Sequence, residues 1–143
     1  MRLDPNVWGP HYWFVLHTIA LTYSGRPNET IKKKYYDFIN NIPLFLPCEE
    51  IGNEFIKILD KYPVTPYLDS RDSLIKWVHF IHNKINQSLG KEEIDLGEAL
   101  STYYDNYKPK VKIDVEAKNR REKLIFISII ILMVLLNIYL LKK

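Results

Sequence analysis

The chain has 143 residues, which is enough for one small domain and a tail but not for several domains. Its formal net charge of +3 is too small to indicate binding of nucleic acid, and the basic residues are spread along the sequence. A single cysteine, Cys48, excludes an internal disulfide framework. The first residues are charged and proline-containing rather than apolar, so we expect no N-terminal signal peptide.

The first predicted helix starts at Pro10, which suits the first turn of a helix because its missing N–H needs no partner there. Trp13, Leu16, His17 and Ala20 recur at helical spacing and share one face. The residues alone leave two interpretations of this face open. It is either a packing surface with Trp13 as its anchor and His17 as a hydrogen-bonded core histidine, or part of a ligand site.

The second and third predicted helices follow a turn at residues 24–28. The second has an apolar face within residues 31–42, for which we predict only a structural role. Cys48 is expected in the first turn of the third helix, where the helix N-terminus favours a thiolate while Glu49 and Glu50 oppose it. The alternative is a buried, unreactive cysteine.

The fourth predicted helix includes most of residues 77–91 and combines an apolar face with a row of polar side chains. His79 and Asn83 are four residues apart, as are His82 and Asn86, so the members of each pair are neighbours on the helix surface. Such a helix can hold a large, flat, partly polar ligand. The alternative is a surface helix whose histidines and asparagines face water.

The fourth helix is expected to end at Gly90, because glycine is the residue that most often follows a helix C-terminus. This end places the Lys91 ammonium where it can meet a phosphate. Beyond it, apolar residues at helical spacing between Ile94 and Tyr107 outline a short fifth helix.

The C-terminal part of the chain is predicted to be a charged linker, residues 108–123, followed by a transmembrane helix, residues 124–141. The latter segment has no formal charge, and at about 1.5 Å rise per residue it spans roughly 27 Å, close to a hydrocarbon core of about 30 Å. More basic residues precede this segment than follow it, which favours a cytoplasmic globular domain on a single-pass membrane protein.

Two motifs of the chain resemble the Erv/ALR family of FAD-linked sulfhydryl oxidases. They are Trp8-Gly9-Pro10-x-x-Trp13-x-x-Leu16-His17-x-x-Ala20 and His82-Asn83-x-Ile85-Asn86 followed by Leu89-Gly90-Lys91. The resemblance extends over about residues 5–107 and implies an all-α fold. Residues 1–107 would form a four-helix bundle around FAD with a short fifth helix. The family usually forms homodimers through the first two helices.

The resemblance also implies an activity, the oxidation of protein thiols to disulfides with O2 as acceptor and H2O2 as product. The family motif is Pro-Cys-x-x-Cys, whereas this chain has Pro47-Cys48-Glu49-Glu50-Ile51. Ile51 therefore stands in place of the cysteine that faces the flavin in the family. Cys48 remains the catalytic candidate, and it would need a second thiol from a partner subunit or another protein.

Nine residues are implied to contact FAD, and no metal site is expected. His79 stands where relatives often carry cysteine, and two tyrosines of the fifth helix stand where they carry tryptophans. The nine residues are Trp13, His17, His79, His82, Asn83, Asn86, Lys91, Tyr103 and Tyr107.

The expected partners are thiol-containing proteins, O2, a membrane and a second copy of the chain, but not nucleic acid. The chain is similar to the membrane-tailed members found in large DNA viruses, which help to form disulfides in virion membrane proteins made in the cytosol. A host or virion membrane is therefore the expected location, with the domain on the cytosolic side.

Two other functions remain open at this point. One is a membrane-anchored protein that binds FAD without catalysis, and the other is a membrane-anchored helical adaptor without a cofactor. Retention of FAD separates the adaptor from the flavoproteins, and oxygen-dependent consumption of thiols separates the oxidase from a non-catalytic flavoprotein.

Overall fold

The computed structural model describes residues 3–108 and 115–141, and the side chains of residues 3–108 and 119–140. These residues form helices and no strands, which confirms the all-α prediction. The chain divides into two compact units, Met1–Tyr107 and Lys108–Lys143. The elements are α1 (Pro5–Leu21), α2 (Glu29–Asn41), the 3-10 helix η1 (Ile42–Phe45), α3 (Glu49–Lys61), the 3-10 helix η2 (Thr65–Tyr67), α4 (Arg71–Ser88), α5 (Leu96–Asp105) and α6 (Val115–Leu141).

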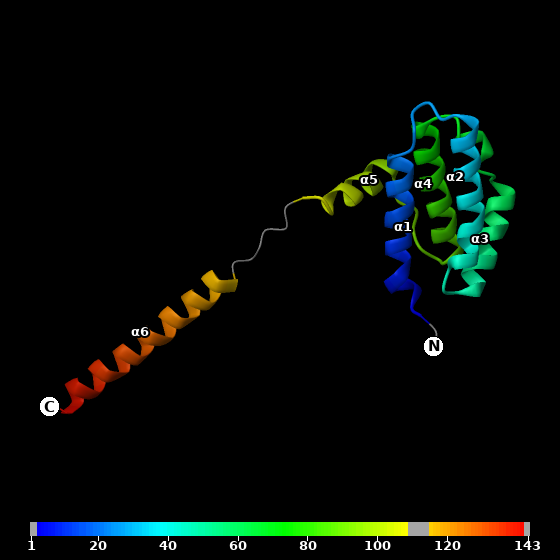
Figure 1. The fold of residues 1–143 in the computed structure, drawn as a ribbon. Coiled ribbons are helices and arrows are strands. Elements are labelled where there is room, and N and C mark those ends of the chain that lie inside the picture. Colours follow the sequence, from blue (N-terminus) through cyan, green and yellow to red (C-terminus); the bar gives the residue numbers. More distant parts are fainter. Residues whose placement is uncertain (1–2, 109–114, 142–143) are drawn as a thin grey trace. The chain divides into compact units, whose positions relative to one another are not determined.

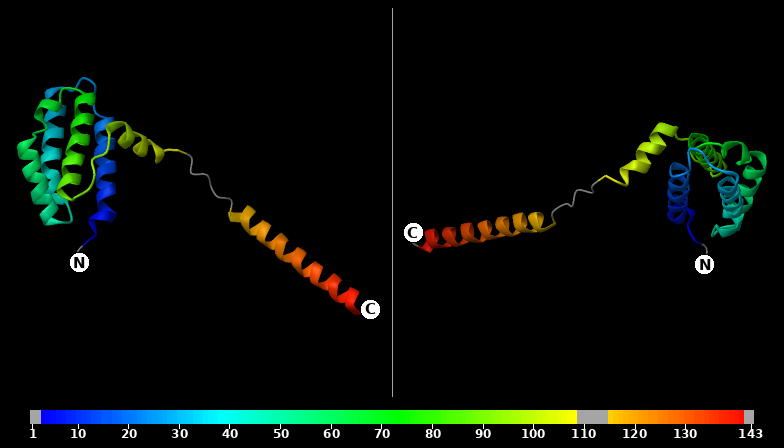
Figure 2. Two further views of the ribbon diagram at one scale, coloured as in Figure 1. Left: turned by 180° about the vertical axis from the view of Figure 1, so that it is seen from behind. Right: turned by 45° about the horizontal axis from the view of Figure 1, so that its top comes forward.

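The first unit is a bundle in which α1, α2, α3 and α4 run side by side (Figure 1). Helix α4 is at its centre, because it packs against α1, α3, α5 and η2. The short helix α5 extends from one end of this bundle in both further views (Figure 2). The predicted arrangement of four helices and a short fifth is therefore confirmed, and the helix that carries most of the candidate ligands is the central one.

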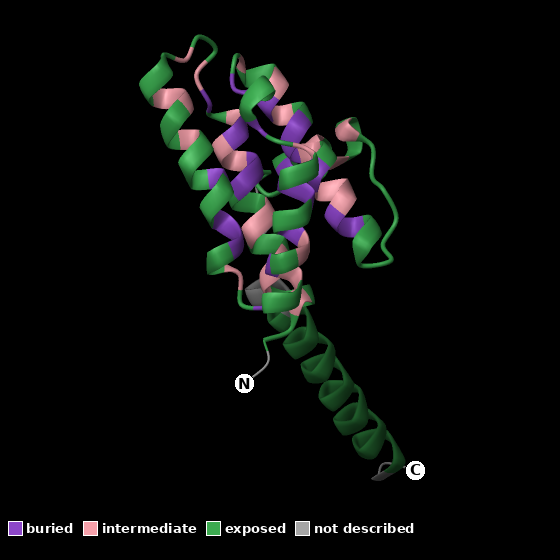
Figure 3. Ribbon diagram, turned by 90° about the vertical axis from the view of Figure 1, so that its right-hand side faces the viewer, coloured by how far each residue is buried: buried purple, intermediate pink, exposed green. Residues whose placement is uncertain are grey.

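The core of the bundle consists of the helix faces that point toward one another (Figure 3). Trp77 is its largest member, and its indole Nε1 donates to the Tyr62 carbonyl oxygen at 3.1 Å. Burying one large apolar side chain contributes about 1.5–3 kcal/mol, so these contacts fix the positions of the helices. The other core residues are Leu16, Ala20, Tyr23, Ile39, Ile42, Phe55, Ile58, Leu59, Val64, Leu68, Leu74, Val78, Ile81 and Ile85.

Local signals set several helix ends. Asn28 caps α2 by accepting from the Ile31 N–H, and Ser70 caps α4. At the C-terminus of α4, Gly90 has a φ of +70°, and the backbone N–H of Lys91 donates to the Asn86 carbonyl at 2.8 Å. This is a Schellman motif, in which glycine adopts the left-handed conformation without steric cost. The predicted end of the fourth helix at Gly90 is confirmed.

Helix α1 begins five residues before Pro10, so the prediction that Pro10 lies in the first turn is wrong. The carboxylate of Asp4 accepts from the Asn6 N–H and caps the helix, and Pro5 takes its first position. Pro10 therefore lies inside α1. Its ring disfavours a helical conformation for the residue before it, and Gly9, which has no Cβ, reduces that clash.

Helix α3 approaches η1 so closely that Gly52 has no room for a side chain. A Cβ at this position would lie 2.9 Å from the Pro43 carbonyl oxygen. We expect Gly52→Ala to destabilise the domain by about 1–3 kcal/mol through overpacking. Gly25→Ala is the control, because a Cβ there meets nothing within 4 Å and should change the stability by less than about 0.5 kcal/mol. Thermal unfolding of both variants tests this, and equal melting temperatures would contradict it.

The second unit contains α6, of which Asn119–Leu140 is long and apolar enough to cross a membrane by length and composition. An 18-residue window within this stretch has a mean hydropathy of 2.5, and the side chains of the stretch are exposed. The helix starts at Val115, so its first turns include Arg120 and Arg121. Residues 109–114 of the expected linker lie outside the described part of the chain.

Candidate functional site

A cavity of about 500 Å³ lies between α1, α4 and α5, a volume typical of small-molecule sites. All four histidines of the chain line it, so we call it the histidine cavity. The rest of its wall is largely apolar and includes Glu98 but no lysine or arginine. Its lining residues are Pro10, His11, Phe14, His17, His79, His82, Asn83, Ile94, Glu98, Ala99, Thr102, Tyr103 and Asn106.

The two central histidines of this cavity form a hydrogen-bonded pair of neutral rings. His17 Nε2 and His82 Nδ1 lie 3.2 Å apart, so one ring donates to the other. Burial lowers the pKa of His17 to about 4, with a smaller effect from His79. Burial likewise lowers the pKa of His82 to about 3, assisted by the charges of His17, His79 and Lys91. Near neutral pH both rings are therefore uncharged.

A second cavity, of about 210 Å³, lies between α1, α3 and α4, and we call it the lysine cavity after Lys91. His82 and Pro10 line both cavities. Trp13 stacks on His82 with ring centroids 4.0 Å apart and planes inclined by 12°. The lysine cavity is lined by Pro5, Trp8, Gly9, Pro10, Trp13, Ile51, His82, Ile85, Asn86, Leu89 and Lys91.

Asn86 and Lys91 are the polar residues that distinguish the lysine cavity. Asn86 is buried, with 8% of its surface exposed. The Lys91 ammonium donates to Asn6 Oδ1 at 3.2 Å and is otherwise at the surface. The Schellman motif holds the backbone of both residues together. A buried amide and a surface cation on one wall suit a ligand that is polar, flat and anionic at one end.

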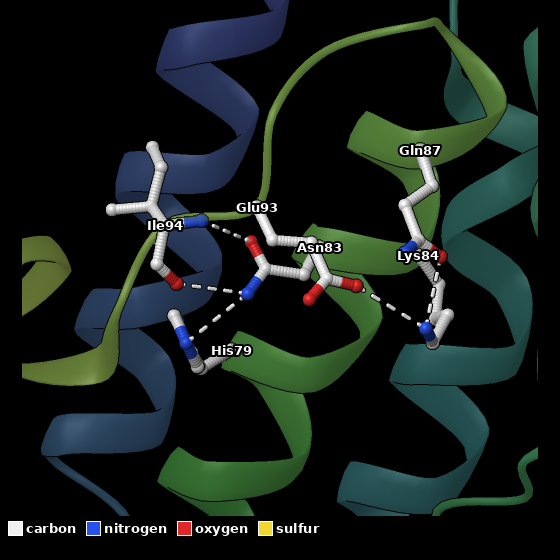
Figure 4. A network of polar contacts seen from close by, with 6 residues as sticks. All are labelled: His79, Asn83, Lys84, Gln87, Glu93 and Ile94. Carbon is white, nitrogen blue, oxygen red and sulfur yellow. Dashed lines mark hydrogen bonds and ion pairs between the residues drawn. The ribbon is translucent and has the colours of Figure 1, made fainter.

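Asn83 has partners within the protein. Its Nδ2 donates to the Ile94 carbonyl oxygen at 2.9 Å, and its Oδ1 accepts from the Ile94 N–H at 3.2 Å (Figure 4). The same Nδ2 lies 3.3 Å from His79 Nε2. Asn83 therefore fixes the segment that leads from α4 to α5, in addition to lining the histidine cavity.

The two tyrosines of α5 differ in their positions. Tyr103 is buried, lines the histidine cavity and packs against Phe14, with ring centroids 5.1 Å apart. Its hydroxyl lies 2.9 Å from Thr18 Oγ1 and 2.8 Å from the Tyr107 hydroxyl. Tyr107 is 61% exposed and lines neither cavity, so it touches the site only through Tyr103 and Phe14.

Cys48 lies at the N-cap of α3, one residue before the first turn in which the sequence predicted it. Its side chain is buried, and its Sγ donates to Glu50 Oε2 at 3.0 Å. Neither cavity is lined by Cys48, whereas Ile51 of the same helix lines the lysine cavity. The structure therefore presents a butyl group, not a thiol, to the cavity wall.

Several lining residues were not singled out in the sequence. Phe14 lies three residues before His17, so the helical spacing of α1 could have indicated it. Trp8 was seen only as part of a motif. Ile94 belongs to the apolar pattern of the fifth helix, but no local signal places Ile94 or Glu98 at the cavity, because that position depends on how α5 packs against α4.

The comparisons with known proteins identify the family. The model of the Erv1 / Alr family matches residues 10–108. The chain belongs to the Erv1 / Alr family. This confirms the resemblance inferred from the motifs.

Individual members of the Erv1 / Alr family support this assignment. The chain is 36% identical over 111 residues to a probable FAD-linked sulfhydryl oxidase of Acanthamoeba polyphaga mimivirus, covering 77% of this chain and 78% of the relative. It is 31% identical to the FAD-linked sulfhydryl oxidase ERV2 of Saccharomyces cerevisiae, covering 74% of this chain and 55% of the relative. The crystal structure of the FAD-binding domain of Erv1 from Saccharomyces cerevisiae superposes with a TM-score of 0.63 at 26% identity, covering 74% of this chain and 95% of that one.

The residues of this Erv1 / Alr domain fit FAD. The cofactor needs room for flat rings, groups that hydrogen-bond to ring edges and a cation for its phosphates. Two adjoining cavities supply the room, and Lys91 supplies the cation. His79 Nδ1 is buried in the cavity wall and has no hydrogen-bond partner among the described residues, so a ligand atom would satisfy it. No group of three or more metal-ligating side chains converges in the described part of the chain.

Proposed function

We propose that the protein is an FAD-linked sulfhydryl oxidase that joins protein thiols into disulfides. Two thiols lose two electrons and two protons, which O2 takes up as H2O2. The observation that carries this proposal is a pair of neighbouring cavities that share His82 and Pro10 in their walls, within the part of the chain that matches the Erv1 / Alr family. Bound FAD supplies a two-electron acceptor between the thiols and oxygen.

The residues that would hold the cofactor include two histidines whose imidazole rings are uncharged. His17 and His82 are neutral and stay so near pH 7, and Trp13 offers an aromatic face beside them. The Asn86 amide and the Lys91 ammonium lie on the wall of the second cavity, where the ammonium suits a phosphate. The apolar remainder of both walls excludes water from the reacting ring.

Cys48 is the proposed catalytic residue, and its partner thiol comes from outside the chain. Its sulfur and that thiol would lose two protons and two electrons to the bound acceptor and form a mixed disulfide, and a second substrate thiol would then displace Cys48 as a thiol and leave the substrate disulfide. The buried position at the N-cap of α3 and the bond to Glu50 mean that the thiol must be uncovered first. Ile51 prevents the chain from forming a disulfide between these two positions by itself.

The test uses the full chain in detergent. We expect a visible flavin absorption band corresponding to about one FAD per chain, which is released on denaturation. Dithiothreitol should then be consumed with uptake of O2, and Cys48→Ser should reduce the rate at least tenfold. A colourless, folded protein would overturn the cofactor assignment, whereas full activity of Cys48→Ser would overturn only the role of this thiol.

One observation favours a second candidate, a membrane-anchored flavoprotein without turnover. The cavity wall carries Ile51 where a thiol would be needed, and Cys48 lines neither cavity. Such a protein would retain FAD but would consume no O2 with dithiothreitol or with a reduced protein substrate. The same experiment therefore separates the two functions.

A homodimer is part of the proposal. Helix α1 exposes Val7 and Val15, with 65% and 51% of their surfaces accessible, and α2 exposes Tyr36 and Phe38. Apolar side chains on two successive helices support an interface between two copies of the chain. Light scattering of the purified protein would give the mass of two chains if the interface forms.

The membrane assignment goes further than the length of α6. We propose that residues 124–141 anchor the domain in a host or virion membrane with the domain on the cytosolic side. The basic residues Arg120, Arg121 and Lys123 before the apolar stretch support this orientation. Protease protection in sealed membranes distinguishes the two orientations.

A further inference from the structure

The starting observation is an unpaired nitrogen in the wall of the histidine cavity. His79 Nδ1 is the buried side-chain nitrogen or oxygen atom that lacks a hydrogen-bond partner within the described residues. The other ring nitrogen, Nε2, contacts Asn83. Whether Nδ1 is a donor or an acceptor decides which ligand atom it can bind, and the hydrogen bonds around Asn83 answer this question.

The backbone of Ile94 fixes the orientation of the Asn83 amide. A backbone N–H can only donate, so the Asn83 atom that faces it must be the oxygen. A backbone carbonyl can only accept, so the atom that faces it must be the nitrogen. Figure 4 shows this two-bond clamp and the histidine beside it. An inverted amide would lose both bonds.

The orientation of Asn83 in turn fixes the tautomer of His79. The Asn83 nitrogen is a donor, and it lies 3.3 Å from His79 Nε2. Nε2 must therefore accept, and in a neutral imidazole the proton is then on Nδ1. His79 thus presents a buried N–H donor that no described residue accepts.

The acceptor that this donor suits belongs to an uncharged ring. The histidine cavity is lined by Glu98 and by no lysine or arginine, which disfavours phosphate there. The aromatic side chains Phe14 and Tyr103 favour a flat ligand. Phosphates are better placed beside Lys91 in the neighbouring cavity.

FAD has two flat rings, and the position of α3 distinguishes them. The lysine cavity is lined by Ile51, which lies in the first turn of the helix that Cys48 caps. The ring that exchanges electrons with thiols belongs at that end. The histidine cavity lies at the other side of His82 and is left for adenine, whose ring nitrogens are acceptors.

We propose that His79 is a specificity-determining residue that donates from Nδ1 to a ring nitrogen of adenine, and that the Asn83–Ile94 clamp holds it in this tautomer. This rests on the proposed function, because it assumes that FAD is the ligand. It makes the histidine cavity the part of the site that distinguishes FAD from FMN.

The test measures binding to the cofactor-free full chain in detergent, with FAD, ADP and FMN as separate probes. His79→Phe keeps a flat side chain but removes the donor. We expect it to lower the affinity for FAD and for ADP about tenfold and to leave the affinity for FMN unchanged. His79→Asn places an amide nitrogen near the position of Nδ1 and should bind FAD within about threefold of the wild type. His79→Gln, whose amide reaches the position of Nε2 instead, should resemble His79→Phe.

A second measurement reports the tautomer without the cofactor. In the protein labelled with 15N-histidine, the nitrogen spectrum of His79 should show a protonated Nδ1, and Asn83→Leu should convert it to a mixture of tautomers. A protonated Nε2 in the wild type would overturn the inference.

The outcomes separate the inference from the function on which it rests. Wild-type protein that binds no FAD would overturn the proposed function. Wild-type protein that binds FAD while His79→Phe binds it equally well would overturn only the role of His79, because water would then satisfy Nδ1. A loss of affinity for FMN in His79→Phe as large as the loss for FAD would also overturn the role of His79, because the isoalloxazine would then be the ring at His79.

Discussion

Replacing Ile51 by cysteine is expected to raise the rate of thiol oxidation at least tenfold, which corresponds to about 1.4 kcal/mol of activation free energy. Position 51 is three residues after Cys48, in the first turn of α3, so the two sulfur atoms would be neighbours at a helix N-terminus. Unlike Cys48, residue 51 lines the lysine cavity. The substitution would therefore supply both a second thiol and a sulfur atom in the cavity wall.

Oxygen uptake with dithiothreitol at fixed protein concentration measures this gain. Ile56→Cys is the matched control, because Ile56 is on the same helix but is exposed and lines neither cavity. The double variant Ile51→Cys with Cys48→Ser should lose the increase, since the two sulfur atoms act together. An Ile51→Cys variant that is no faster than the wild type would show that the thiol pair is not what limits turnover.

Acidification is expected to destabilise the domain through the buried histidine pair. The folded-state pKa values of His17 and His82, about 4 and about 3, lie below the ordinary value of 6.5. The unfolded chain then binds more protons than the folded chain as the pH falls below 6.5, so stability is complete above that pH and is lost below it. At pH 5 each histidine should have lowered the free energy of unfolding by about 2 kcal/mol. That is a large share of the roughly 5–15 kcal/mol by which a typical domain is stable.

Urea unfolding at a series of pH values from 7.5 to 5 tests this prediction. His17→Asn should remove about half of the pH dependence of the free energy of unfolding, because the asparagine amide does not titrate in this range. His11→Asn is the control, since His11 is exposed, and it should leave the dependence unchanged. A midpoint that does not move between pH 7.5 and pH 5 in the wild type would mean that the two rings are not held neutral by burial.

The features that the sequence predicted well depend on local spacing. His79, His82, Asn83 and Asn86 are three and four residues apart, so any helix brings them to one side, and α4 does so. Gly90 ends that helix because of its own conformational freedom. That these residues bind FAD stays a prediction, although the cavities at which they lie are consistent with it.

The features that the sequence could not predict depend on how separate elements pack. Asn83 meets Ile94, eleven residues later, only because of the path of the chain between α4 and α5. Tyr103 and Tyr107 are equivalent in a helical pattern, yet packing of α5 buries the first and exposes the second. The start of α1 was missed because the cap at Asp4 was outweighed by the usual preference of proline for a first turn.

The single sulfur atom at the N-cap of α3 has a kinetic consequence. A disulfide contains two sulfur atoms, and this chain contributes one. Under the proposed function, the disulfide-forming step needs a thiol from a second molecule, whereas an enzyme with an internal dithiol supplies both thiols itself. At saturating oxygen the rate should still fall when the protein and its thiol partner are diluted together, whereas the Ile51→Cys variant should form its own disulfide at a rate that is independent of dilution.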